Sequence, residues 1–172
     1  MARIAMRYGL GTVVAIGIVA GIIFAVFEMV AAAILMGPEA AVMPLRMIGA
    51  IVLGPAALDP GYSLITAALA GVIVHLVLSI LFTGIFAVVA SAITVTFGRE
   101  FLSTPGSLAL AGVGFGIALW LVNFYIVAPV AGWMWFPERT NPLVQFLAHA
   151  FFFGAPIGWM LGRTRAAIGP TI

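Results

Sequence analysis

Long apolar stretches alternate with short breaks along the whole chain. Four of them, residues 8–36, 63–97, 108–128 and 142–161, are long enough to cross a bilayer core, which takes roughly 20 helical residues. The breaks contain turn formers such as Asp59-Pro60-Gly61, and Asn141-Pro142 is a typical helix start. The pattern predicts an all-α membrane protein: one domain over residues 1–172, built as a bundle of four transmembrane helices.

Between the first two predicted spans lies a further apolar segment, residues 43–58, which is too short to cross the membrane. Pro44 could begin a helix there, and Arg46 is the only basic residue of the segment. Two interpretations remain open. The segment is either an interfacial helix on the outer face of the membrane or a re-entrant hairpin that covers the bundle.

The composition agrees with a membrane location. Hydrophobic residues make up 65% of the 172 residues and charged residues 7%, with a mean hydropathy of +1.29, whereas about a quarter of a soluble domain is charged. The absence of cysteine excludes disulfides and thiolate metal sites. A net charge of +2 is too small to indicate nucleic-acid binding. No glycine-rich phosphate loop or serine nucleophile elbow is present, which favours a non-enzymatic role.

The arginine distribution predicts the orientation. If the N-terminus is cytoplasmic, five arginines fall on the cytoplasmic side: Arg3, Arg7, Arg99, Arg163 and Arg165. Only Arg46 and Arg139 then fall in the outer loops. The positive-inside rule therefore places both termini in the cytoplasm. Three aromatic residues lie in the second outer loop, where an interfacial belt is expected: Trp133, Trp135 and Phe136.

Each predicted span has a stripe of small or polar residues spaced about four apart, as at close helix contacts in membranes. The stripes are Gly17, Gly21 and Ala25; Gly71, His75, Ser79 and Thr83; Gly112 and Gly116; and Gln145 and His149. Each stripe includes or leads to a polar residue. At 1.5 Å per residue, Glu28, His75, Asn123 and His149 fall in one band of the outer half of the bilayer. Ionisable residues at such depth usually face the bundle interior, so we expect a shared polar cluster.

Several kinds of chemistry suit that cluster. His75 and His149 could hold haem b, with Arg46 near the propionates and Gly71 and Gly154 giving the porphyrin room. The two histidines with Glu28 could instead bind a transition metal. A proton or substrate path would use the same residues, and a cluster that only specifies helix pairing is the remaining alternative. No HExxH motif decides between them.

Short motifs give one family resemblance. The stretch His75-Leu76-Val77-Leu78-Ser79-Ile80 and the pair Phe136-Pro137-Glu138 and Phe146-Leu147-Ala148-His149 resemble the YagU-like bacterial inner-membrane proteins. The order of four helices with an outer segment after the first is also similar. The resemblance implies a multi-pass protein of the bacterial inner membrane. It implies no activity, because that family has no settled biochemical function.

The sequence favours a small integral membrane subunit or binding protein within a larger bacterial membrane assembly, possible cofactors being haem b or a metal. The chain has no soluble domain that could carry chemistry outside the membrane, which suggests this role. The alternative is a small oligomeric transporter or channel with Glu28 and the histidines on its path. The expected partners are the lipid bilayer and other membrane proteins or further copies of the chain, with no nucleic acid.

Overall fold

The computed structural model describes residues 8–98 and 102–168, and within them it contains helices and no strands. Four helical units are long and apolar enough to cross a membrane: Leu10–Met36, Leu64–Phe97, Pro105–Ala131 and Pro142–Thr164. The prediction of an all-α bundle with four spanning helices is therefore confirmed. The predicted bounds agree within a few residues, except that the third helix continues past its predicted end at residue 128.

The first two spans are single helices, α1 (Leu10–Met36) and α3 (Leu64–Phe97). The other two spans are composite. The third consists of α4 (Pro105–Val122), the π-helical segment η3 (Asn123–Val127) and α5 (Ala128–Ala131). The fourth consists of α7 (Pro142–Leu147), the π-helical segment η4 (Ala148–Gly154) and α8 (Ala155–Ile168).

Local sequence explains where the helices begin and end. The Ser63 hydroxyl caps α3 by accepting from the Thr66 N–H, and Thr104 forms a capping box with Ser107 at the start of α4. Asn141 caps α7 through its side-chain oxygen. α1 and α3 both end at a glycine with positive φ, Gly37 at 106° and Gly98 at 95°, where a side chain would be strained.

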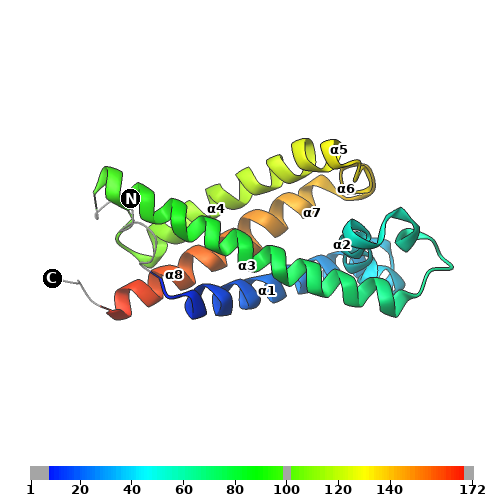
Figure 1. Ribbon diagram of the computed structural model, residues 1–172, viewed down its shortest axis with the longest axis horizontal. Helices are drawn as coiled ribbons and strands as arrows, with labels where there is room; N and C mark the ends of the chain where they lie inside the picture. The colour runs from blue at the N-terminus through cyan, green and yellow to red at the C-terminus, as the bar shows by residue number, and fades with distance from the viewer. Residues whose placement is uncertain (1–7, 99–101, 169–172) are drawn as a thin grey trace.

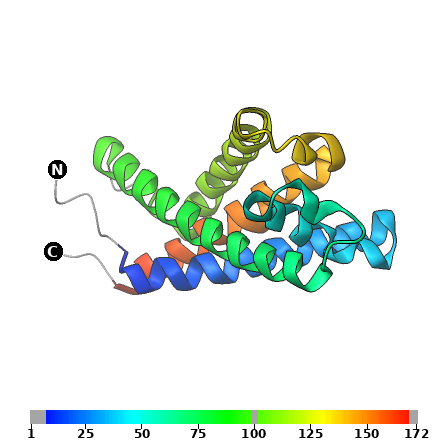
Figure 2. The same ribbon diagram turned by 45° about the vertical axis from the view of Figure 1, so that its right-hand side comes forward.

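Successive spans run in opposite directions, so α1 begins and α8 ends at the same end of the bundle (Figure 1). α3 packs against α1, and α4 packs against η4 and α8. α1 also contacts η4, which joins these two pairs. α3 and α4 diverge from each other, as the turned view shows (Figure 2). The bundle is thus two tight helix pairs with a wider seam between α3 and α4.

The predicted small-residue stripes are the contact surfaces of these pairs. On α3, His75, Ser79 and Thr83 are all buried. The Ser79 and Thr83 hydroxyls donate to carbonyls one turn earlier, at 2.8 and 2.7 Å, so they need no partner on another helix. On α4, Gly112 and Gly116 lie directly against the backbone of the fourth span.

The outward faces of the spans are as apolar as the interior. Ile34 on α1 is 76% exposed, Ile65 on α3 is 73% exposed, and Leu110 on α4 is 74% exposed. A helix that is hydrophobic on all sides is expected where lipid rather than water surrounds the protein. The exterior therefore supports the multi-pass membrane assignment.

The segment between the first two spans forms η1 (Pro38–Val42), α2 (Met43–Leu53) and η2 (Pro55–Leu58). α2 packs mainly against α3 and also contacts α1. The Arg46 guanidinium donates to the Ala57 carbonyl at 2.9 Å and to the Asp59 carbonyl at 2.6 Å, which fastens η2 onto α2. Arg46, the only charged residue of α2, therefore binds the segment that follows α2 in the chain.

The outer-loop aromatic residues pack against other parts of the protein. Trp135, in α6 (Trp135–Arg139), is only 8% exposed, and its indole N–H donates to the Met47 carbonyl of α2 at 3.1 Å. The Phe136 ring packs edge-on against Phe124. A buried indole with a backbone partner is satisfied without the membrane interface. These aromatic residues instead pack α6 onto α2 and η3.

Candidate functional site

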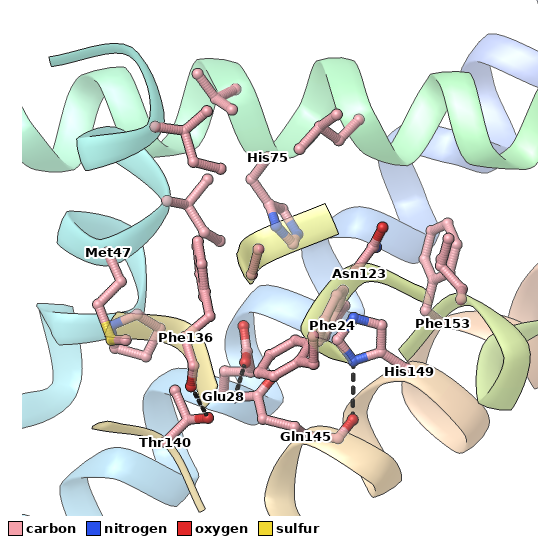
Figure 3. A pocket seen from close by; sticks show the side chains of 18 of the residues that line it. Phe24, Glu28, Met47, His75, Asn123, Phe136, Thr140, Gln145, His149 and Phe153 are labelled. Atoms are coloured by element: carbon pink, nitrogen blue, oxygen red, sulfur yellow. Dashed lines mark hydrogen bonds between the residues drawn. The ribbon is translucent and has the colours of Figure 1, made fainter. Parts of the chain in front are cut away.

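A cavity of about 320 Å³ lies between α1, α2, α3, η3 and η4. Its volume falls in the range of small-molecule sites in proteins, near the lower limit. Most of its lining is apolar, and the polar side chains that reach it are Glu28, His75, Ser79, Asn123, Thr140, Gln145 and His149. Figure 3 shows residues of all four spans pointing into this space. The four residues expected to form one cluster, Glu28, His75, Asn123 and His149, therefore line one cavity.

Glu28, Gln145 and His149 form a connected set. The Gln145 side-chain amide donates to Glu28 Oε1 at 2.6 Å, which joins α7 to α1. His149 Nδ1 donates to the backbone carbonyl of Gln145 at 2.8 Å, one turn earlier in the same span. Glu28 is 6% exposed, Gln145 8% and His149 5%. Short hydrogen bonds hold these buried groups, as burial requires.

His75 makes the corresponding link between α3 and α1. Its Nε2 donates to the carbonyl of Gly21 at 2.8 Å. That carbonyl belongs to the stripe along which α1 and α3 pack, because a side chain at Gly21 would meet the Ser79 hydroxyl. The close approach of the two helices therefore places the imidazole where it can bond to the backbone of α1.

The Phe24 ring packs against both histidines. Its centroid lies 5.1 Å from the His75 ring and 4.8 Å from the His149 ring. Phe124 packs perpendicular to His149 at 5.6 Å. Sequence reasoning did not identify Phe24 as a site residue. The available signal was its position, one helical turn after Gly21 and one turn before Glu28 on the same face of α1.

Asn123 and His149 both lie in π-helical segments. The N–H of Ala128 bonds to the Asn123 carbonyl and that of Ala155 to the Ala150 carbonyl, five residues earlier in each case. Each segment is followed by a proline, Pro129 or Pro156, which cannot donate to the preceding turn. The widened turns restore hydrogen bonding and re-aim nearby side chains, and such bulges are frequent at functional sites. Pro129 lies inside the third span, which continues to Ala131.

Arg46 does not reach the cavity, because its guanidinium is bonded to the carbonyls of Ala57 and Asp59. The two glycines expected to give a porphyrin room are used in helix contacts. A side chain at Gly71 would collide with the Leu45 carbonyl, and one at Gly154 with the Gly112 carbonyl. The Phe24 ring packs against both imidazoles, and His75 Nε2 is bonded to the Gly21 carbonyl. The residues therefore do not fit a haem held by both histidines.

The metal prediction also lacks support. Within residues 8–98 and 102–168, no group of three His, Asp or Glu side chains is placed to share a metal ion. His75, His149 and Glu28 line the same cavity but are bonded to separate partners: a glycine carbonyl, a glutamine carbonyl and a glutamine amide. The Phe24 ring packs against both imidazoles.

Comparisons of the chain with protein-family models, with curated proteins and with solved structures gave no match. The resemblance to YagU-like proteins therefore stays a prediction. Function must be argued from the cavity itself.

Proposed function

We propose that the protein is a small integral membrane binding protein that holds an apolar small molecule by a polar end group. The observation that supports this proposal is the cavity of about 320 Å³ with apolar walls and a polar cluster on one side. Pockets for small molecules have this character, with mainly apolar walls and few polar groups that orient the ligand. We further propose that the protein belongs to the YagU-like group of the bacterial inner membrane.

The empty space beside the polar groups favours binding over a purely structural cluster. Protein interiors are close-packed, and voids larger than a water molecule are few. A cluster that only paired helices would bury Glu28 and His149 against each other or against packed side chains. Instead both line an open volume, and the Asn123 side chain has no hydrogen bond within the described residues. The polar end group of a bound molecule would supply hydrogen-bond partners for the polar side chains that line the cavity.

The position of the cavity favours entry from the lipid. Val74 and Leu78 of α3 and Leu119 and Val127 of the third span all line it, so its wall includes both of the helices that diverge. An apolar molecule dissolved in the bilayer could pass between them without entering water. Such access needs no aqueous channel, which agrees with the apolar walls.

We assign α2 the role of a re-entrant lid over the cavity rather than an interfacial connector. Pro44, Met47, Ile48 and Ile51 of α2 form part of the cavity wall. α2 also packs against α3, where Gly49 of α2 lies against the Ala67 carbonyl. A helix that lay only on the membrane surface would not be expected to form a wall of a cavity inside the bundle.

We retain the proposal that the protein works within a larger membrane assembly or as a homo-oligomer. The spans contain most of the described residues, so only a minor part of the described chain is available outside the membrane to contact soluble partners. The lipid-exposed faces of the spans are the surfaces available for other membrane proteins.

The test is to identify apolar molecules that stay with the protein. Protein purified from membranes in mild detergent is extracted with organic solvent, and the extract is analysed by mass spectrometry. The variant Val74→Trp fills the cavity wall, whereas Ile73→Trp places the same ring on a neighbouring residue that is 63% exposed. We expect a molecule enriched with the wild type and with Ile73→Trp, and lost from Val74→Trp. Equal extracts from all three proteins would contradict the proposal.

A transport function is the second candidate, because a smaller cavity of about 70 Å³ adjoins the first. Glu28 and Gln145 line both, and the smaller one reaches Arg139 and Asn141 near the α2 end of the bundle. A proton path through Glu28 would use this connection. Proteoliposomes with an internal pH-sensitive dye test it: wild type should acidify faster than Glu28→Gln under a proton gradient. A wild-type rate equal to that of empty liposomes would remove the transport proposal.

A further inference from the structure

The two buried histidines have fixed and opposite proton positions. A backbone carbonyl can only accept a hydrogen bond, so the ring nitrogen bonded to it must bear the hydrogen. In His75 that nitrogen is Nε2, which bonds to the Gly21 carbonyl. In His149 it is Nδ1, which bonds to the Gln145 carbonyl. The backbone of the bundle therefore selects one tautomer for each ring.

The second nitrogen of each ring is a bare acceptor. Within the described parts of the chain neither imidazole has a carboxylate partner, and an unpaired imidazolium inside the bilayer is costly. Both rings are therefore neutral, and a neutral imidazole with one N–H has one unprotonated nitrogen. His75 Nδ1 and His149 Nε2 have no hydrogen-bond partner in the described chain. Both rings line the cavity, and they enter it from different spans (Figure 3).

From this we infer that the cavity recognises an apolar phenol or alcohol with two hydroxyl groups, each donating to one of the two histidines. The inference rests on the proposed binding function and specifies its ligand class. Only a donor can satisfy the two bare nitrogens. A ligand whose polar atoms are carbonyl or ether oxygens would place lone pairs against lone pairs. The carboxyl and amide groups of Glu28 and Asn123 can serve either kind of ligand, so they do not decide the preference.

The cavity walls suit the apolar part of such a molecule. Phe24, Phe82, Phe124, Phe136 and Phe153 all contribute to the lining. Aromatic rings pack well against one another in offset or edge-on arrangements. An aromatic diol, such as an alkyl-substituted hydroquinone, would use both the aromatic walls and the paired acceptors. An aliphatic diol would use the acceptors alone.

Matched ligands test the inference on the unaltered protein. Wild type in lipid nanodiscs is titrated by calorimetry with four probes: hexylhydroquinone under anaerobic conditions, its dimethyl ether, the corresponding quinone, and a vicinal octanediol. Empty nanodiscs provide the partition background. We expect hexylhydroquinone to bind at least about tenfold more tightly than the ether and the quinone, because those two leave buried acceptors unpaired. Tighter binding of the octanediol than of the ether would show that two hydroxyl groups are sufficient for recognition without an aromatic ring. Weaker binding would restrict the ligand class to phenols.

Two variants test whether the histidines cause the preference for the hydroquinone over its ether. His149→Phe keeps a ring beside Phe24 but removes one acceptor, so the hydroquinone should lose most of its advantage over the ether. Ile73→Phe, on the exposed face of α3, should keep the advantage. If His149→Phe does not fold, the wild-type comparison still decides the matter. Equal or tighter binding of the quinone overturns the donor preference while leaving the binding function intact. Absence of binding by all four probes overturns the ligand class, whereas the binding function itself fails only if no molecule is lost on Val74→Trp.

Discussion

At the scale of single residues, backbone carbonyls determine what the site can do. Gly21 and Gln145 each present a carbonyl to an imidazole, and these two bonds fix which nitrogen of each histidine is left unprotonated. The sequence indicated that both histidines are buried on inward faces. It could not indicate their tautomers, because those depend on which carbonyl the fold brings within reach.

The opposite tautomers can be observed directly. We expect His75 to show a protonated Nε2 and His149 a protonated Nδ1, because each bonded carbonyl requires a donor. Solid-state NMR of histidine ¹⁵N-labelled protein in lipid distinguishes the two tautomers by their ring nitrogen shifts, and His149→Phe assigns the signals. Identical tautomers at both positions would contradict the assigned hydrogen bonds.

The Glu28–Gln145 bond gives a second prediction at this scale. Glu28→Gln keeps an oxygen that can accept from the Gln145 amide, whereas Glu28→Leu leaves that amide unpaired inside the bundle. An unsatisfied buried donor costs about 1–3 kcal/mol. We expect Glu28→Leu to unfold in detergent several degrees below Glu28→Gln, measured by intrinsic fluorescence on heating. Equal melting temperatures would show that the bond contributes nothing to stability.

Some site residues were predictable and others were not, for a physical reason. A glutamate or histidine inside an apolar span contrasts with its neighbours, so Glu28, His75 and His149 were evident from the sequence. Phe24 gives no such contrast, because aromatic residues are as common on lipid-facing surfaces as in cores. Only its contact with both imidazoles shows its importance.

At the scale of helices, glycines set the separations and prolines set the local geometry. The sequence predicted the inward stripes correctly, since a repeat of four residues marks one face of a helix. It did not predict that Pro129 and Pro156 would be accommodated by π-helical segments. A proline removes one N–H, and whether the helix ends, kinks or widens depends on how the neighbouring span packs against it.

The α4 stripe can be tested with a matched pair of glycines. A methyl group at Gly116 would collide with the carbonyl of His149, whereas one at Gly114 meets nothing within 4 Å. We expect Gly116→Ala to lower the melting temperature in detergent, because α4 must move away from η4. Gly114→Ala should have no effect or raise it, since alanine favours helix by about 1 kcal/mol over glycine. A melting temperature for Gly116→Ala at or above that of Gly114→Ala would refute the close contact.

At the scale of the whole molecule, the number of spans was predictable but the cavity was not. The number of spans depends on the length and hydropathy of each segment, and both can be read directly from the sequence. The cavity depends on the divergence of α3 from α4, which follows from each helix packing on a different partner. No single segment encodes that arrangement.

The same scale gives the last prediction, that both termini are cytoplasmic. The arginine bias suggests it, although Arg3, Arg7 and Arg99 lie outside the described residues and nothing is described of the Arg165 side chain. Because α1 begins and α8 ends at the same end of the bundle, we expect both termini on one side of the membrane. Near that end Arg163 stacks on Trp159, with 5.4 Å from its guanidinium carbon to the ring centre, a pairing suited to a membrane interface.

Reporter fusions in a bacterial host determine which side this is. Green fluorescent protein exported in unfolded form does not fluoresce in the periplasm, whereas alkaline phosphatase is active only there. We expect fluorescence from a fusion after Ile172 and phosphatase activity from an insertion after Gly61, in the loop before α3. The reverse pair of results would invert the molecule and place Glu28 and the cavity in the cytoplasmic half of the bilayer. Signals from both sites on the same side would contradict the alternating directions of successive spans, and with them the four-span bundle that forms the cavity.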